Sequence, residues 1–181
     1  MKRLYVSRHG ESELNARGIY AGQLNTPLTN HGRAQARAAG VQARNLDLDL
    51  IVASPLDRAL ETAQIIAREI NYPIDDILTN PLVMERALGS LEGQPRTAGP
   101  ETVENCPDIE PDADLDARAE AALAYLYSLE ADTVLVVSHG TFLMALKRAL
   151  GGELSTELPN AQILEFDLTE TPYAPDYVLD R

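Results

Sequence analysis

Two short apolar runs in this chain end in the same way, and this repeated ending is the strongest constraint on its fold. The two segments are Leu4-Tyr5-Val6-Ser7-Arg8-His9-Gly10 and Val134-Leu135-Val136-Val137-Ser138-His139-Gly140. Short runs rich in branched residues are typical of buried strands, and the glycine after each run lets the chain turn sharply. Open α/β sheets build their sites at strand ends. If the two strands are neighbours, both imidazoles lie at one edge of the sheet, with Arg8 beside them.

Strand and helix patterns alternate along the rest of the chain, which favours a layered α/β fold with a largely parallel sheet. Strands are expected at about residues 3–7, 50–53, 77–84, 133–138 and 162–168, the last of them at a sheet edge. Helices are expected at about residues 30–44, 55–70, 115–129 and 140–150. We expect Ser54 to cap the second helix, because Pro55 suits the first helical position.

The length and the charge of the chain limit its organisation and its partners. Its 181 residues, 45% of them hydrophobic, predict one domain over residues 1–181. The formal net charge of −13 argues against nucleic acid or an anionic membrane as a partner, since both bind basic surfaces. Such a chain cannot steer a phosphorylated ligand over a long range. An anion site therefore has to be a local cluster of arginine and histidine.

Sequence features of several other protein classes are missing. Cys106 is the only cysteine, so the chain can form no internal disulfide, and it has no cysteine–histidine pattern for zinc. No apolar run approaches the roughly 20 residues of a membrane span. The acidic run at 112–116 does not fit a calcium loop, which needs glycine and glutamate where Ala117 and Leu123 stand. We therefore expect a soluble cytoplasmic protein, and the sequence shows no zinc or calcium pattern.

Residues 92–116 stand apart from the alternation of strands and helices. The segment contains four prolines, two glycines and a dense acidic run, with little periodicity. We interpret it as an irregular, lid-like insertion over the sheet. Charged runs are most often exposed loops, and that interpretation explains the segment equally well. Cys106 has no positive neighbour that would activate it, so we assign it no chemistry and expect it to be exposed.

The segment around His9 contains the residue types that phosphoryl transfer requires. One imidazole nitrogen can attack phosphorus while the other is held by a hydrogen bond. Arg8 has a planar set of donors for phosphate oxygens. Ser12 and Asn15 follow in a polar loop, where hydroxyl, amide and backbone donors can surround an oxyanion. An arginine–histidine pair without a chemical role can have the same local sequence. This segment alone therefore does not distinguish a catalytic pair from such a pair.

Arg58 stands where a cation opposes the helix dipole. It lies in the first turn of the helix that follows Ser54-Pro55, and this end of a helix favours anions. The conflict disappears if Arg58 and the helix N-terminus bind an anion together. An Arg58 that is exposed to solvent is the alternative.

A phosphoryl-transfer site also needs a carboxyl group that first protonates the leaving oxygen and then activates water. Glu85 follows the third expected strand, so its side chain can reach the same sheet edge. Glu92 can serve instead, or both are ordinary surface acids. The remaining histidine, His31, is expected to be a polar residue in the first turn of a helix rather than a catalytic one.

Taken together, these segments resemble the histidine phosphatase superfamily, the phosphoglycerate mutase-like proteins. The matching motifs are Arg8-His9-Gly10 with Ser12 and Asn15, Gly22, Pro27-Leu28-Thr29 with Gly32, Gln35 and Ala36, Ser54-Pro55 with Arg58, Thr62 and Ala63, Glu85 with Gly89 and Leu91-Glu92-Gly93, and Ser138-His139-Gly140. They occur in order over about residues 2–150. The resemblance implies a three-layer α/β/α sandwich around a mostly parallel mixed sheet, with a short lid insertion at about 92–116.

The resemblance also implies a role for each site residue. His9 is the nucleophile that becomes phosphorylated, and Glu85 is the proton donor. Arg8, Arg58 and His139 hold the transferred phosphoryl group, and no metal or other cofactor is needed. The residues expected to bind the substrate phosphate are Arg8, Ser12, Asn15, Gly22, Arg58 and His139.

Departures from the family pattern favour hydrolysis of a small phosphorylated metabolite. Asn25 stands where many members have aspartate, and Leu14 where mutases favour an aromatic residue. The insertion is shorter than in glycolytic mutases, and no basic residue between Arg96 and Arg118 can hold a second anionic group. Two alternatives stay open: a phosphoglycerate mutase, which is an isomerase, and a non-catalytic module that binds a phosphorylated ligand or a protein. All five residues expected at a catalytic centre are present, which argues against such a module. They are Arg8, His9, Arg58, Glu85 and His139.

Overall fold

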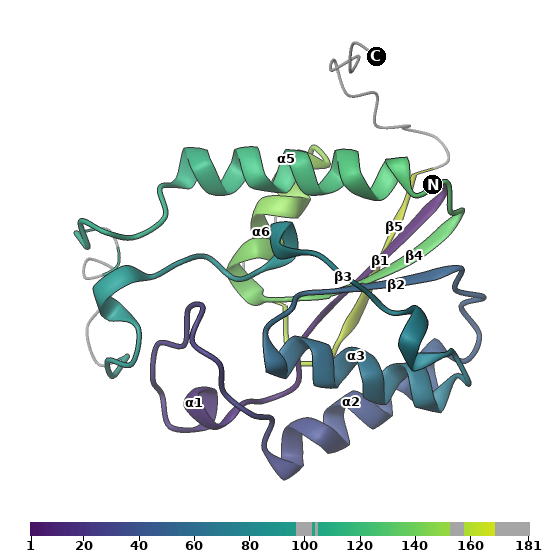
Figure 1. Ribbon diagram of the computed structural model, residues 1–181, viewed down its shortest axis with the longest axis horizontal. Helices are drawn as coiled ribbons and strands as arrows, with labels where there is room; N and C mark the ends of the chain where they lie inside the picture. The colour runs from purple at the N-terminus through teal and green to yellow at the C-terminus, as the bar shows by residue number, and fades with distance from the viewer. Residues whose placement is uncertain (97–102, 104, 153–157, 169–181) are drawn as a thin grey trace.

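The computed structural model describes residues 1–96, 103, 105–152 and 158–168. A central five-stranded sheet has helices on both of its faces (Figure 1). This is the three-layer α/β/α arrangement that the sequence predicted. Within the described residues, no helix is both long enough and apolar enough to cross a membrane.

The sheet is mixed and mostly parallel. Its strands are β1 (Arg3–Arg8), β2 (Leu50–Ala53), β3 (Leu78–Thr79), β4 (Thr133–Ser138) and β5 (Ile163–Asp167), in the order β3-β2-β4-β1-β5. β4 pairs in parallel with β1 and β2, and β2 pairs in parallel with β3. β5 pairs antiparallel with β1 at the edge. The predicted mostly parallel sheet and the edge position of its last strand are confirmed.

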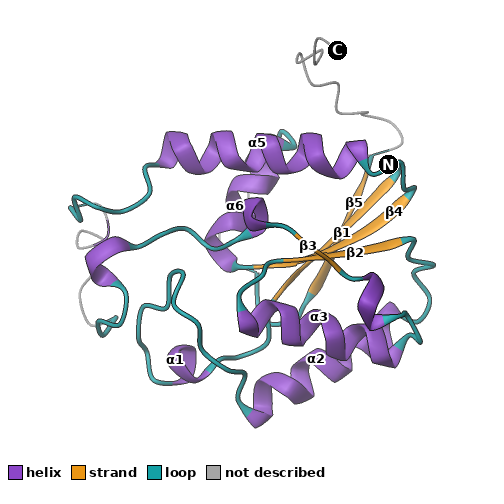
Figure 2. Cartoon of the chain, viewed as in Figure 1, coloured by secondary structure: helices purple, strands orange, loops and turns teal. Residues whose placement is uncertain are grey.

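The helices form the two outer layers. The longer ones are α2 (Asn30–Ala43), α3 (Asp57–Glu69), α5 (Asp112–Ser128) and α6 (Gly140–Ala149). Figure 2 shows α2 and α3 on one face of the sheet and α5 and α6 on the other. Shorter helical turns are α1 (Glu13–Ala16), η1 (Ile74–Asp76), η2 (Pro81–Val83) and η3 (Gly89–Leu91).

Alternation of side chains along the strands divides the core into two clusters. Along β4, Val134 and Val136 belong to the cluster with the buried residues of α5 and α6, whereas Leu135 and Val137 belong to the cluster with α2 and α3. Successive side chains of a strand point to opposite faces, which explains this division. Every residue of β4 is buried, as expected for a central strand covered on both faces.

Three element boundaries differ from the sequence prediction. The third strand contains only Leu78–Thr79, because Pro81 begins the η2 turn soon afterwards. The helix α3 begins at Asp57, and Ser54 does not cap it. Asn25 Oδ1 accepts the Asp57 amide instead, at 3.1 Å. The helix α5 begins at Asp112, so the irregular insertion ends earlier than predicted.

The described part of the insertion packs against the segment that follows β3. Cys106 is buried rather than exposed as predicted, because its thiol lies against Leu88 O at 3.7 Å and Asp108 Oδ1 at 3.0 Å. Ser90 also donates to Asp108, from both its amide and its hydroxyl. Residues 97–102 and 104 of the predicted lid lie outside the described residues, so its role as a lid stays a prediction.

The pairing of β1 with β4 positions the site. Arg8 stands in register with Ser138, and the amide of His9 donates to the Ser138 carbonyl at 2.9 Å. Because these strands are parallel, their carboxyl ends lie at the same edge of the sheet. His9 and His139, the residues that follow them, are therefore neighbours.

Candidate active site

Two buried histidines lie side by side at this sheet edge. The ring centroids of His9 and His139 are 5.1 Å apart, with the ring planes tilted by 58°. His9 is 2% exposed and His139 is fully buried. The two strand ends thus bring the imidazoles together, as the sequence predicted for neighbouring strands.

Hydrogen bonds at both ring nitrogens fix the orientation and the tautomer of His9. Nδ1 lies 2.6 Å from the Gly10 carbonyl, which can only accept, so Nδ1 carries the proton and Nε2 carries a lone pair. Arg58 Nε donates to that lone pair at 3.2 Å. Burial, followed by the nearby Arg58 charge, holds the pKa of His9 well below its ordinary value. His9 is therefore neutral at physiological pH, the form that can attack phosphorus.

Close packing and side-chain anchors hold the backbone around His9. A Cβ at Gly10 would lie 2.4 Å from the carbonyl oxygen of Gly32, so close packing on α2, not a positive φ, requires glycine at this turn. Thr62 Oγ1 accepts the Gly10 amide at 3.0 Å and donates to the Arg58 carbonyl at 2.7 Å. Asn160 Nδ2 donates to the His9 carbonyl at 2.8 Å. These contacts tie His9 to α3 and to the residues before β5.

Arg58 is buried in the site rather than exposed, which excludes the alternative of a solvated side chain. It is 1% exposed and donates to the carbonyls of Gly22 and Leu24 at 2.7 and 2.8 Å. Burial lowers its pKa to about 10, so it remains charged at neutral pH. Gly22, which has φ +49°, thus contributes a carbonyl that orients Arg58.

His139 is bound differently from His9. Its Nε2 lies 2.8 Å from Ser54 Oγ, and its Nδ1 is buried without a hydrogen-bond partner among the described residues. Burial and the charge of Arg58 hold the pKa of His139 well below its ordinary value. The hydroxyl that the sequence assigned to a helix cap is therefore used to orient the second imidazole.

Glu85 reaches the site from the segment after β3. Its Oε1 accepts the amide of Arg86 at 2.9 Å and the amide of Phe142, in the first turn of α6, at 3.1 Å. A carboxylate is favourable there because helix N-termini attract negative charge. Glu85 lines the same cavity as His9.

Glu92, the other candidate acid, has a different environment. Its Oε1 accepts the amides of Gln23 and Leu88 at 2.9 and 3.1 Å. It is not among the described residues that line the cavity. Glu92 thus links two loops, whereas Glu85 lines the cavity.

Of the predicted phosphate ligands Ser12 and Asn15, only Asn15 lines the cavity. They form a reciprocal cap at the start of α1, in which each side chain accepts the other's backbone amide at 3.4 Å. Asn15 lines the cavity, but Ser12 is fully buried and does not. Ser12 thus supports the loop in which Asn15 lies.

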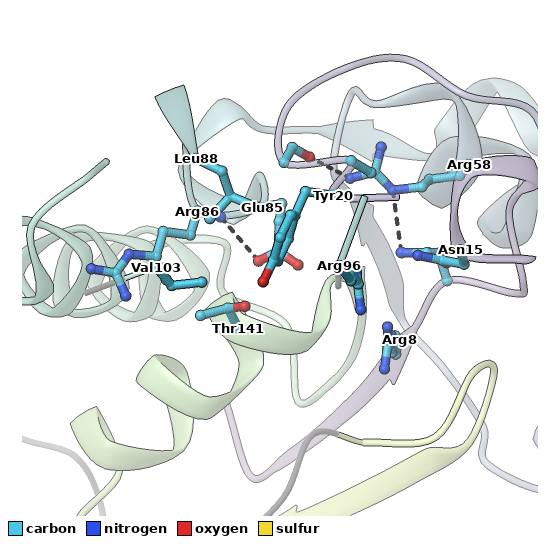
Figure 3. Close-up of a pocket in the computed structure, with 13 residues that line it drawn as sticks. Arg8, Asn15, Tyr20, Arg58, Glu85, Arg86, Leu88, Arg96, Val103 and Thr141 are labelled. Carbon is cyan, nitrogen blue, oxygen red and sulfur yellow. Dashed lines mark hydrogen bonds between the residues drawn. The ribbon is translucent and has the colours of Figure 1, made fainter. Parts of the chain in front are cut away.

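His9, Asn15, Arg58 and Glu85 line one cavity of about 200 Å³ (Figure 3). Its charged side chains are Arg8, Arg58, Arg86, Arg96 and Glu85. In the view of Figure 3, Arg8, Arg58 and Arg96 lie on the side of Asn15, and Glu85 and Arg86 lie on the opposite side. Four arginines line this small cavity, which makes it the candidate for a local anion site on a chain of net charge −13.

Sequence reasoning missed several residues that line the cavity. They are Tyr20, Ala21, Arg86, Leu88, Arg96, Val103 and Thr141. Arg96 lies 5.5 Å from the centroid of the Tyr20 ring, within range of a cation–π contact. Arg86 had a visible signal, since it follows Glu85 directly. Arg96 had none, because its position depends on the pairing of residues 18–20 with 93–96.

Across the described part of the chain, no group of three or more His, Cys, Asp or Glu side chains is arranged to hold a metal ion.

Comparison with known proteins assigns the family. The model of the histidine phosphatase superfamily (branch 1) matches residues 4–177. The chain belongs to this superfamily. A relative from Enterobacter sp. (strain 638), named "Probable phosphoglycerate mutase GpmB", is 35% identical, covering 96% of this chain and 88% of the relative. A Bacillus subtilis relative, named "Uncharacterized phosphatase PhoE", is 34% identical over 94% of this chain and 90% of its own.

Solved structures of superfamily members share the fold of this chain. A mycobacterial glucosyl-3-phosphoglycerate phosphatase has a TM-score of 0.78 and 26% identity, covering 93% of this chain and 94% of that one. Phosphoserine phosphatase from Entamoeba histolytica has a TM-score of 0.76 and 26% identity, covering 92% and 90%. The relatives therefore include proteins named as phosphatases and proteins named as mutases.

Proposed function

We propose that this superfamily member is a phosphatase that hydrolyses small phosphate monoesters through a phosphohistidine on His9, with Glu85 as the proton donor. The observation that carries the proposal is the state of His9. Its Nδ1 donates to a carbonyl, its Nε2 lone pair lies beside Arg58, and its lowered pKa keeps the ring neutral. A neutral imidazole held in one tautomer beside fixed positive charge suits attack on a phosphoryl group.

In the first step, His9 Nε2 attacks phosphorus and the bond from phosphorus to the ester oxygen breaks. Arg8 and Arg58 stabilise the charge on the phosphoryl oxygens, and His139 contributes from the neighbouring strand end. The protonated Glu85 carboxyl gives its proton to the leaving oxygen, which departs as an alcohol. The products of this step are the phosphohistidine and a Glu85 carboxylate.

In the second step, the Glu85 carboxylate takes a proton from water as the water oxygen attacks phosphorus. The bond between phosphorus and His9 Nε2 breaks, and inorganic phosphate leaves. His9 is again neutral and Glu85 is again protonated, so the cycle closes without a further reactant. The position of Glu85 in the cavity wall, opposite Arg8, Arg58 and Arg96, supports both of its roles.

A phosphoglycerate mutase is the second candidate, because relatives carry that name. The sequence argument against it relied on a shortage of basic residues for a second anionic group. Arg86 and Arg96 both line the cavity, which weakens that argument. An assay that compares release of inorganic phosphate with conversion of 3-phosphoglycerate to its 2-isomer separates the two activities.

The proposal is tested with a panel of small phosphate esters and by trapping of the phosphoenzyme. We expect release of inorganic phosphate and a labelled protein that is acid-labile and base-stable, as phosphohistidine is. Faster isomerisation than phosphate release would identify a mutase. A label on Ser12 or Ser138 would overturn the assignment of His9 as nucleophile.

A further inference from the structure

Arg118 of α5 uses its whole guanidinium group to hold other residues of the protein. Nε and Nη2 donate to the two carboxylate oxygens of Glu110, each at 2.8 Å. Nη1 donates to the carbonyls of Leu82 and Met84 at 2.8 Å, and Nη2 also donates to the Glu85 carbonyl at 3.3 Å. These five bonds match the five N–H donors of a guanidinium. Arg118 therefore has no donor left for a ligand.

Glu110, the partner of Arg118, also binds the two residues that follow Glu85 in the chain. Its Oε2 accepts the amide of Ala87 at 3.1 Å, and its carbonyl accepts Arg86 Nε at 2.7 Å. Burial alone would raise the pKa of Glu110, but its hydrogen bonds and charge interaction with Arg118 outweigh burial and hold the pKa below its ordinary value. The side chains of Arg118 and Glu110 are 16% and 15% exposed. This partly buried ion pair holds the chain on both sides of Glu85.

Arg118 also contacts the residue that binds the Glu85 carboxylate. Its guanidinium carbon lies 5.1 Å from the centroid of the Phe142 ring, and the Phe142 amide donates to Glu85 Oε1 at 3.1 Å. One side chain thus contacts both the backbone that carries Glu85 and the residue that orients its carboxylate. The segment around Glu85 contains only short helical turns, so it cannot hold this position through strand or helix hydrogen bonds alone.

We infer that Arg118, through its ion pair with Glu110, is the positioning residue that holds Glu85 in place for proton transfer. The inference rests on the proposed function, because it assigns Glu85 the role of acid and base. General acid catalysis needs the donor within hydrogen-bond reach of the leaving oxygen, and a small displacement of Glu85 removes that contact. Loss of Arg118 should therefore act on the proton-transfer step and leave the nucleophile and the phosphate ligands in place.

The test compares Arg118→Met with wild type in rates of phosphoenzyme formation from an alkyl phosphate and from 4-nitrophenyl phosphate. The alkyl leaving group needs a proton, whereas 4-nitrophenolate departs as a stable anion. We expect the alkyl rate to fall about 10- to 100-fold, the effect of a displacement of about 1 Å, with little change in the aryl rate. Arg148→Met is the matched control, because Arg148 pairs with Asp116 of α5 without contacting the Glu85 segment. Equal losses on both substrates, or no loss, would overturn the inference.

A double-mutant cycle with Glu85→Gln measures the coupling between Arg118 and Glu85 in the rate of phosphoenzyme formation. A purely structural role of Arg118 would not produce such coupling. If Arg118 acts through Glu85, then Arg118→Met in the Glu85→Gln background should not slow phosphorylation by the alkyl phosphate any further. Additive losses in the cycle contradict the inference. If Arg118→Met does not fold, Arg118→Lys takes its place in the same cycle, since lysine keeps the charge but lacks the planar fork. If the Glu85→Gln variant has the wild-type rate, the proposed function fails. If Glu85→Gln slows the reaction but the Arg118 variants do not, only the inference about Arg118 fails.

Discussion

The ends of β1 and β4 have nearly the same local sequence but different surroundings. At the end of β1, both ring nitrogens of His9 have partners, the Gly10 carbonyl and Arg58 Nε. At the end of β4, His139 precedes α6 and pairs through Nε2 with Ser54. His9 lines the arginine-rich cavity, whereas His139 is not among the described residues that do.

This difference shows that a strand ending in His-Gly does not by itself define a nucleophile. Nδ1 of His9 faces a carbonyl, so its proton position is determined. Ser54 offers His139 a hydroxyl that can donate or accept, so its hydrogen bond leaves the tautomer open. The partners at Nε2 of the two rings, Arg58 and Ser54, come from distant segments of the chain, whereas the Gly10 carbonyl belongs to the residue next to His9. The following predictions test this distinction.

Removal of either ring gives the largest expected effects. His9→Ala should abolish both turnover and the phosphoenzyme, because the attacking nitrogen is gone. His139→Ala should still form the phosphoenzyme, but about 10²- to 10³-fold more slowly, the usual loss when one group that stabilises developing charge is removed. Radiolabelled substrate and quenched-flow sampling measure both. A phosphoenzyme in His9→Ala but not in His139→Ala would reverse the roles of the two strand ends.

The next effect concerns the carboxylate held at the first turn of α6. Glu85→Gln should slow hydrolysis of alkyl phosphates by about 10²- to 10⁴-fold, the range for general acid–base catalysis. With an activated aryl phosphate, a burst of released phenol followed by slow turnover is expected, since the second step still needs the base. Glu92→Gln is the control, because its carboxylate binds only loop amides in the structure. Leaving-group dependence in Glu92→Gln alone would move the acid to Glu92.

Removal of the hydroxyl groups of Thr62 and Ser54, which support the two histidines, should give smaller effects. Thr62→Val leaves the buried Gly10 amide without its acceptor, and Ser54→Ala removes the partner of His139. Each should lower the free energy of unfolding by about 1 to 3 kcal/mol, the cost of an unsatisfied buried polar group. Urea unfolding measures this change. Thr62→Val should also slow phosphorylation more than Ser54→Ala does, because Thr62 holds both Gly10 and Arg58. The opposite order would contradict the contrast between the two strand ends.

The smallest effect is a dependence on pH that both rings share. Their lowered pKa values predict that neither His9 nor His139 titrates at pH 6.5 in the free protein, which NMR of the ring protons can follow. Below pH 6.5 the unfolded chain binds protons that these native rings do not, so stability should be complete above that pH and fall below it. A midpoint at or above pH 6.5 for either ring would show that its burial does not control its charge.

Local patterns in the sequence were sufficient for most of the fold. Branched apolar runs identified β1, β2 and β4, because this signal depends on residues close together in the chain. The neighbouring positions of His9 and His139 followed from their place after two parallel strands. The weakly marked third strand was predicted too long, since one proline ended it.

Tertiary structure decided which candidate residues form the cavity and which support it. Ser54 looked like a helix cap, yet it binds His139; Asn25, far away in the chain, binds the first amide of α3. Sequence position alone left both Glu85 and Glu92 as candidate acids, and the structure gives the two carboxylates different amide partners. Arg96 and Arg118 showed no local signal at all. The sequence by itself determined the strands, the helices and the residues available at their ends, because backbone geometry and side-chain periodicity are local. Only the packed structure decided their roles, because a buried polar group takes its hydrogen bonds and its charge state from whichever distant segments surround it.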